Sequence, residues 1–160
     1  MEPLAIFVLQ FLWFLFAWSL IAYFAIWPWS ARFSLDARLS VWIAPEMFRV
    51  LGLGVLVRNL SPGMPRGFAF ATAAGDALTA LLAALALMGQ QRGWGQARGL
   101  AWACTVVGTL DLAIAFPHTA ATGATSHLAA QWYVAVFAGP PLVVCHVACF
   151  LLLARGRGIS

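Results

Sequence analysis

Long apolar runs restrict the fold of this chain more than any other feature of its sequence. A helix needs about 20 mostly apolar residues to cross the hydrocarbon core of a membrane, and its backbone groups must be satisfied within the segment. Four runs approach or exceed this length, at residues 4–27, 67–88, 100–116 and 130–154. Because 63% of the residues are hydrophobic and only 9% are charged, the chain predicts an all-α, polytopic membrane protein rather than a soluble domain.

A fifth run, at residues 41–57, is ambiguous by hydropathy because it contains Pro45, Glu46 and Arg49. The distribution of arginine favours a span, since positive charge is enriched in cytoplasmic loops. If the run crosses the membrane, the arginines divide six against two between the sides: Arg32, Arg38, Arg92, Arg98, Arg155 and Arg157 against Arg58 and Arg66. We therefore predict an antiparallel bundle of five transmembrane helices in a single domain of residues 1–160, with the N-terminus outside and the C-terminus inside.

The net charge of +4 does not indicate a nucleic-acid-binding protein, because the arginines are spread through short connections and form no basic cluster with interleaved aromatic residues. We interpret them as orientation signals that contact membrane lipids. Cys104, Cys145 and Cys149 lie inside apolar runs without a CxxC pair. We expect buried, reduced thiols, and neither a disulfide framework nor a zinc site. No cofactor is expected.

Five ionisable residues fall inside the predicted spans and are the candidates for a functional centre. Glu46 and Arg49 lie on the second helix, Asp76 on the third, Asp111 on the fourth and His146 on the fifth. A charged side chain costs about 2.5–3.5 kcal/mol on membrane-insertion scales, so such residues usually face a bundle interior or a cavity. We predict that these five meet between helices two to five, and that helix one packs outside the polar centre.

Spacing on the third helix adds two hydroxyls to the candidate ligand-binding or proton-binding residues, because Thr72 and Thr79 share one stripe with Asp76. The charges do not balance, since one arginine faces three carboxylates and full ionisation would leave a net charge of −2 at low dielectric constant. We expect Arg49 to bind one of the two aspartates bidentately. At least one other acid then carries a proton, unless the histidine is cationic or water reaches the site.

Smaller features complete the expected architecture. The sequence Gly139-Pro140-Pro141 predicts a kink or short break in the last helix. His118 and His127 are expected in an outer loop, where with the nearby Asp111 they form a poorly spaced alternative for a metal site. Small residues on helices two, three and four are expected to let the backbones approach closely: Gly52, Gly54, Ala71, Gly75 and Gly108.

Several of these residues form a pattern that resembles a family of small, functionally uncharacterised bacterial integral-membrane proteins. The pattern consists of Phe48-Arg49-Val50-x-Gly52, Met64-Pro65, Phe68-Ala69, Ala74-Gly75-Asp76, Gly108-x-x-Asp111-Leu112, and Pro140-Pro141 leading to His146. The resemblance implies a multi-pass protein of the bacterial inner membrane and brings no activity with it. Translocator proteins and sterol-isomerase-like proteins are similar only in size, helix number or buried acids, because their characteristic segments have no counterpart here.

Three classes of function are compatible with this reading. The first is a binding or transport protein for a small lipophilic or ionic molecule, linked to protons, with Arg49 as the anion partner and the acids as proton or cation sites. The second is a membrane enzyme acting on a lipid-like substrate, with Asp76, Asp111 or His146 as general acid or base. The third is an accessory or assembly subunit of a larger membrane complex, or a homo-oligomer, in which the charges form a structural clamp between helices.

Overall fold

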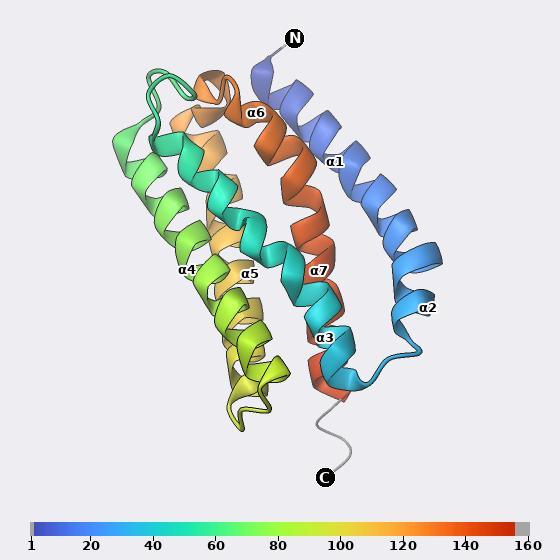
Figure 1. Ribbon diagram of the computed structural model, residues 1–160. Helices are drawn as coiled ribbons and strands as arrows, with labels where there is room; N and C mark the ends of the chain where they lie inside the picture. Colours follow the sequence, from blue (N-terminus) through green and yellow to red (C-terminus); the bar gives the residue numbers. More distant parts are fainter. Residues whose placement is uncertain (1, 156–160) are drawn as a thin grey trace.

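The computed structural model describes residues 2–155, and these residues form helices and short connections with no β-strand among them (Figure 1). Five helices are long and apolar enough to cross a membrane, at residues 3–30, 35–56, 66–91, 97–122 and 131–155. The all-helical prediction is therefore confirmed, and the ambiguous second run is one of the five. Arg157, which contributed to the arginine count, lies outside the described residues.

The first long helix consists of α1 (Pro3–Ile21), a π-helical segment η1 (Ala22–Ile26) and α2 (Trp27–Ser30). It lies at the edge of the bundle (Figure 1). The π turns occur just before Pro28, whose missing N–H disturbs the α-helical hydrogen-bond pattern.

The second long helix begins six residues before the predicted run. It starts as an α-helix, α3 (Leu35–Ile43), with the Ser34 hydroxyl accepting a hydrogen bond from the backbone N–H of Ala37. From Ala44, one residue before Pro45, it continues as a 3₁₀ helix, η2 (Ala44–Leu56). Thirteen residues is unusually long for this conformation.

The third and fourth long helices, α4 (Arg66–Gln91) and α5 (Ala97–Thr122), form an antiparallel hairpin (Figure 1). The fourth extends past the predicted end at Phe116. Pro117 lies inside it, and the Thr119 and Thr122 hydroxyls donate to backbone carbonyls one turn back. The helix ends at Gly123, in the left-handed conformation with φ +63°. The prediction that His118 lies in an outer loop is therefore wrong.

The last long helix follows a short 3₁₀ turn, η3 (Ala124–His127). It comprises α6 (Gln131–Tyr133), a second π-helical segment η4 (Val134–Ala138) and α7 (Gly139–Arg155). No break occurs at Gly139-Pro140-Pro141, contrary to one of the predicted alternatives, because helical conformation continues through these residues. The π turns end immediately before them, so the missing proline donors fall where the hydrogen-bond pattern changes.

Two of the three apolar clusters in the described residues make up most of the core. The larger packs α3, α4, α5 and α7 together around fully buried residues such as Leu39, Ile43 and Leu152, and it includes the free, buried Cys104, Cys145 and Cys149. The smaller joins α1 to the start of the last long helix through Phe7, Phe11, Leu128 and Val136. The third packs η2 against α4 through Val55, Ala69 and Ala73.

Candidate functional site

The 3₁₀ geometry of η2 aligns the residues that build the site. With three residues per turn, side chains at i, i+3, i+6 and i+9 lie in one line. Glu46, Arg49, Gly52 and Val55 have this spacing, and the buried residues of η2 are Glu46, Arg49 and Val55. In an α-helix, Glu46 and Val55 would point in opposite directions, about 180° apart. The conformation therefore turns one continuous line of residues toward the bundle.

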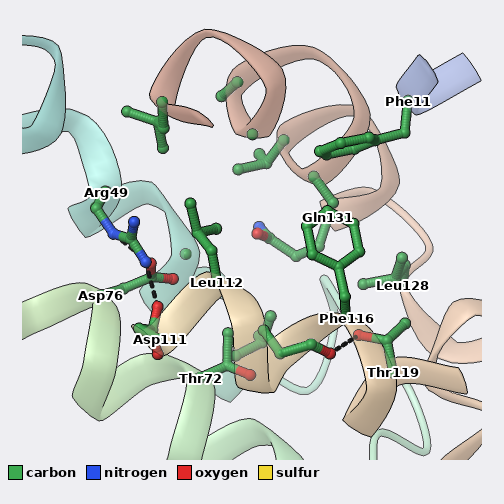
Figure 2. Close-up of a pocket in the computed structure, with 18 of the residues that line it drawn as sticks. Phe11, Arg49, Thr72, Asp76, Asp111, Leu112, Phe116, Thr119, Leu128 and Gln131 are labelled. Carbon is green, nitrogen blue, oxygen red and sulfur yellow. Dashed lines mark hydrogen bonds and ion pairs between the residues drawn. The ribbon is translucent and has the colours of Figure 1, made fainter. Parts of the chain in front are cut away.

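The Arg49 guanidinium lies at the centre of the site and contacts acids from three elements; Figure 2 shows the two aspartates beside it. Its Nε donates to Asp76 Oδ1 of α4 at 3.0 Å, and its Nη2 donates to Asp111 Oδ2 of α5. Its Nη1 lies 3.7 Å from Glu46 Oε2, one 3₁₀ turn earlier. The prediction of one bidentate carboxylate is wrong. Arg49 divides its donors between both aspartates because these approach from different helices.

Glu46 and His146 contact the arginine but are not among the residues that line the cavity described below. The His146 Nε2 atom is 3.3 Å from Glu46 Oε2 and 3.4 Å from Arg49 Nη1. Glu46 is 1% exposed, and neither of its carboxyl oxygens has a hydrogen-bond partner among residues 2–155. Glu46 is thus a buried acid held at ion-pair distance from one arginine and one histidine.

Glycines provide the space that brings these side chains to Arg49. A Cβ atom on Gly52 would overlap the Asp76 carboxylate, and one on Gly75 would overlap the Asp111 carboxylate. A Cβ atom on Gly108 would lie 2.5 Å from Cε1 of His146, closer than real Cβ contacts. At these glycines a polar side chain of another helix occupies the space that a Cβ atom would take, and η2, α4 and α5 pack closely as predicted. Ala71, predicted to have the same role, is exposed.

A cavity of about 140 Å³, measured as the space open to the centre of a water molecule, extends from the aspartates toward α1 (Figure 2). By this measure one water needs about 10–15 Å³, so the cavity has room for several waters or an organic group. Asp76 and Asp111 form its charged end, and their side chains are 14% and 13% exposed. Its aromatic lining comes from four elements: Phe7, Phe11, Phe48, Phe68 and Phe116.

Three uncharged polar residues also line the cavity: Thr72, Thr119 and Gln131. The Thr119 hydroxyl donates to the Ala115 carbonyl at 2.7 Å. Gln131 is 6% exposed and lines the cavity (Figure 2), and its amide lies against Gly54 of η2, where an added Cβ atom would overlap Nε2. Thr79, a predicted site residue, does not line the cavity. Its hydroxyl donates to the Gly75 carbonyl at 2.8 Å instead.

The alternative metal site is not assembled. His118 lies in α5 with its ring 5.3 Å from that of Phe68, and His127 Nδ1 lies 3.3 Å from the Pro62 carbonyl oxygen. Within residues 2–155, no three His, Cys, Asp or Glu side chains are arranged to hold a metal ion. Sequence reasoning also missed Gln131 and the phenylalanines, because a single amide and scattered aromatic residues look ordinary in apolar runs. The only signal for Gln131 was its position as the one amide in the run at residues 130–154.

The sequence model of one protein family matches residues 6–154, and its description is Domain of unknown function (DUF8737). No curated protein and no solved structure matches the chain. The match agrees with the expected resemblance to a family without an assigned activity. The motif pattern and the bacterial source stay predictions.

Proposed function

The chain belongs to the family of the domain of unknown function DUF8737, and we propose that it is a multi-pass protein of the bacterial inner membrane that binds or transports a small molecule or ion in a proton-linked way. The cavity is the observation that carries this proposal. At its charged end, Asp76 and Asp111 are bound to Arg49, and its walls are mostly aromatic and aliphatic. Small-molecule sites commonly combine an apolar lining with a few convergent polar groups.

Membrane embedding is supported by the apolar surface of the first long helix. Large exposed side chains cover it: Leu9, Leu12, Trp13, Phe16, Tyr23 and Phe24. A contiguous apolar surface of this kind is unfavourable in water and typical of contact with lipid or a partner. For the orientation, the connections that hold Arg32 and Arg92 lie at the same end as the Arg155 end of α7, and the η2–α4 connection lies at the other (Figure 1). This arrangement fits a cytoplasmic C-terminus.

A purely structural clamp would need no cavity at the charged centre. Arg49 is fully paired, as a clamp requires, but both aspartates also face the cavity. Glycines at positions 52 and 75 keep their carboxylates in that position. Ion pairs without a cavity would hold the helices together equally well. Carboxylates that line a cavity therefore support a binding role.

Proton linkage is supported by the charge balance. One arginine and three acids lie within a few ångströms of one another at low exposure. Buried charge without compensation is costly. A proton or a bound cation on the acids reduces this cost, so a ligand that changes the charge at Asp76 and Asp111 also changes the number of protons bound there.

The proposal is tested on protein purified into lipid nanodiscs. Native mass spectrometry reports co-purifying small molecules, and thermal unfolding at several pH values reports stabilisation by added compounds. Ala115 lines the cavity, whereas Ala113 on the same helix is exposed and does not line it. Ala115→Phe should abolish binding by filling the cavity, and the matched control Ala113→Phe should retain it.

Several outcomes would contradict the proposal. A wild-type protein that carries no small molecule and is stabilised by none would leave the structural clamp as the explanation. Binding that is equally strong in Ala115→Phe would place the ligand elsewhere. The two other predicted classes are checked in the same preparation, because an enzyme would alter added lipid extract over time and an accessory subunit would co-purify with a protein partner.

A further inference from the structure

We infer that the cavity takes a lipophilic organic ammonium ion, whose charged nitrogen lies against Asp76 and Asp111 and whose apolar body lies among the phenylalanines. This inference rests on the proposed function and narrows it to one class of ligand. It starts from the side chains that face the cavity and from the charge that surrounds them.

The charged groups around the cavity have an excess of negative charge. Arg49 of η2 is the one cationic residue in the lining, and Asp76 of α4 and Asp111 of α5 both face the cavity. Glu46 of η2 adds a third acid behind the arginine, where α7 contributes only His146. The segments of α1, α6 and η4 in the lining supply no charged side chain. A cation at the charged end therefore meets net attraction, whereas an anion meets two carboxylates and an arginine already bound to both.

The rest of the lining suits an apolar body attached to a cation. Phe11 of α1 and Phe116 of α5 are in edge contact, with ring centroids 4.7 Å apart. In Figure 2 they line the cavity on the side away from Arg49. Aromatic faces attract cations within about 6 Å of the ring and also pack against apolar groups. A strongly hydrated inorganic cation would find few oxygen ligands there.

Gln131 provides an observation that is independent of the acids. The residue is 6% exposed and lines the cavity, and its side chain is in none of the side-chain hydrogen bonds of residues 2–155. An N–H of a ligand ammonium group near Gln131 would donate to the Oε1 atom of this amide. The charge excess, the aromatic lining and the Gln131 amide all favour the same class of molecule.

The experiment uses three probes with one apolar body and different heads: 4-phenylbutylamine, 4-phenylbutanol and 4-phenylbutyrate. Binding to the wild-type protein in nanodiscs of zwitterionic lipid is measured by isothermal titration calorimetry, with empty nanodiscs as the blank for partitioning. We expect the amine to bind at least tenfold more tightly than the alcohol, and the carboxylate more weakly than both. Titrations in buffers of different ionisation enthalpy should show proton release with the amine and none with the alcohol, because the ammonium competes with protons for the acids.

Variants sharpen this result. Asp76→Asn with Asp111→Asn should remove the preference for the amine and leave binding of the alcohol, whereas Gln131→Leu should weaken the amine severalfold. Equal affinity for amine and alcohol, or a preference for the carboxylate, would overturn this inference while the proposed binding function stands. Failure of all three probes, together with stabilisation by no other compound, would overturn both. The comparison among probes needs only the wild-type protein, so it remains decisive even if the double variant does not fold.

Discussion

The four helices that meet at Arg49 and the first helix of the bundle are held in different ways. Around Arg49, polar side chains pair across helices and occupy spaces left by glycines. The first helix makes mainly aromatic contacts, and 11% of the residues in its most apolar 18-residue stretch are buried, against 22–44% in the corresponding stretches of the other four. In lipid, apolar surfaces gain little from meeting each other, so close packing and polar contacts determine helix positions. The comparison teaches that the polar centre fixes four helices, while the first mainly covers the cavity.

The largest expected effect follows from removing the arginine itself. Arg49→Met leaves three acids without their common partner, and breaking a buried ion pair in this way costs about 3–5 kcal/mol. We expect a loss of this size in the free energy of unfolding, measured by titration with sodium dodecyl sulfate in mixed micelles.

A matched pair elsewhere in the chain serves as the control. Arg98 Nε lies 3.2 Å from Asp36 Oδ1, which is close to the 3.0 Å between Arg49 and Asp76, but both members are more than half exposed. Arg98→Met should therefore cost at most about 1 kcal/mol. Similar losses for the two variants would contradict a special role for the buried centre.

The next effect concerns the space left by a glycine. Gly75→Ala places a methyl group where the Asp111 carboxylate lies, so either the acid or the α4–α5 packing must shift. Overpacking of this kind costs about 1–3 kcal/mol. Gly99 is also helical but has open space around it. Gly99→Ala should leave the free energy of unfolding unchanged or raise it slightly. If Gly99→Ala lowered it as much as Gly75→Ala does, the cost would come from alanine in general and not from the space that Asp111 needs.

A smaller effect is expected in the first helix. Phe11→Ala removes the ring contact with Phe116 that covers the cavity, and an aromatic pair contributes roughly 0.5–1.5 kcal/mol. Phe16 lies on the same helix but is 56% exposed, so Phe16→Ala should change stability by less than about 0.5 kcal/mol. Losses as large as that of Arg49→Met would mean that the first helix is as firmly held as the other four.

The smallest effect belongs to the hydrogen bond that joins the first and last long helices. Trp132 Nε1 donates to Gln10 Oε1 at 2.7 Å. Interhelical hydrogen bonds of this kind contribute about 0.6 kcal/mol on average in membrane proteins. A double-mutant cycle with Gln10→Leu and Trp132→Phe should give a coupling free energy of this size, whereas a value of several kcal/mol would contradict the contrast between the two regions.

Much of the fold was predictable because it depends on properties that add up along a segment. The transfer free energies of the apolar residues identify four helices. The arginine distribution indicates that residues 41–57 form another one, and the structure has a long apolar helix at residues 35–56. The ends were less predictable. Helix α5 continues through Pro117 to Thr122, beyond the apolar run that identified it.

The sequence by itself determined which residues are candidates for the centre, because ionisable side chains in apolar runs are costly wherever they lie. Only the tertiary structure decided how they meet. The 3₁₀ conformation of η2 aligns Glu46 with Arg49, and the glycines of one helix admit the acids of the next. The cavity and its Gln131 amide also depend on side chains from distant segments. Such relations arise from packing between helices, whereas hydropathy and spacing within one helix indicate only which side chains turn inward.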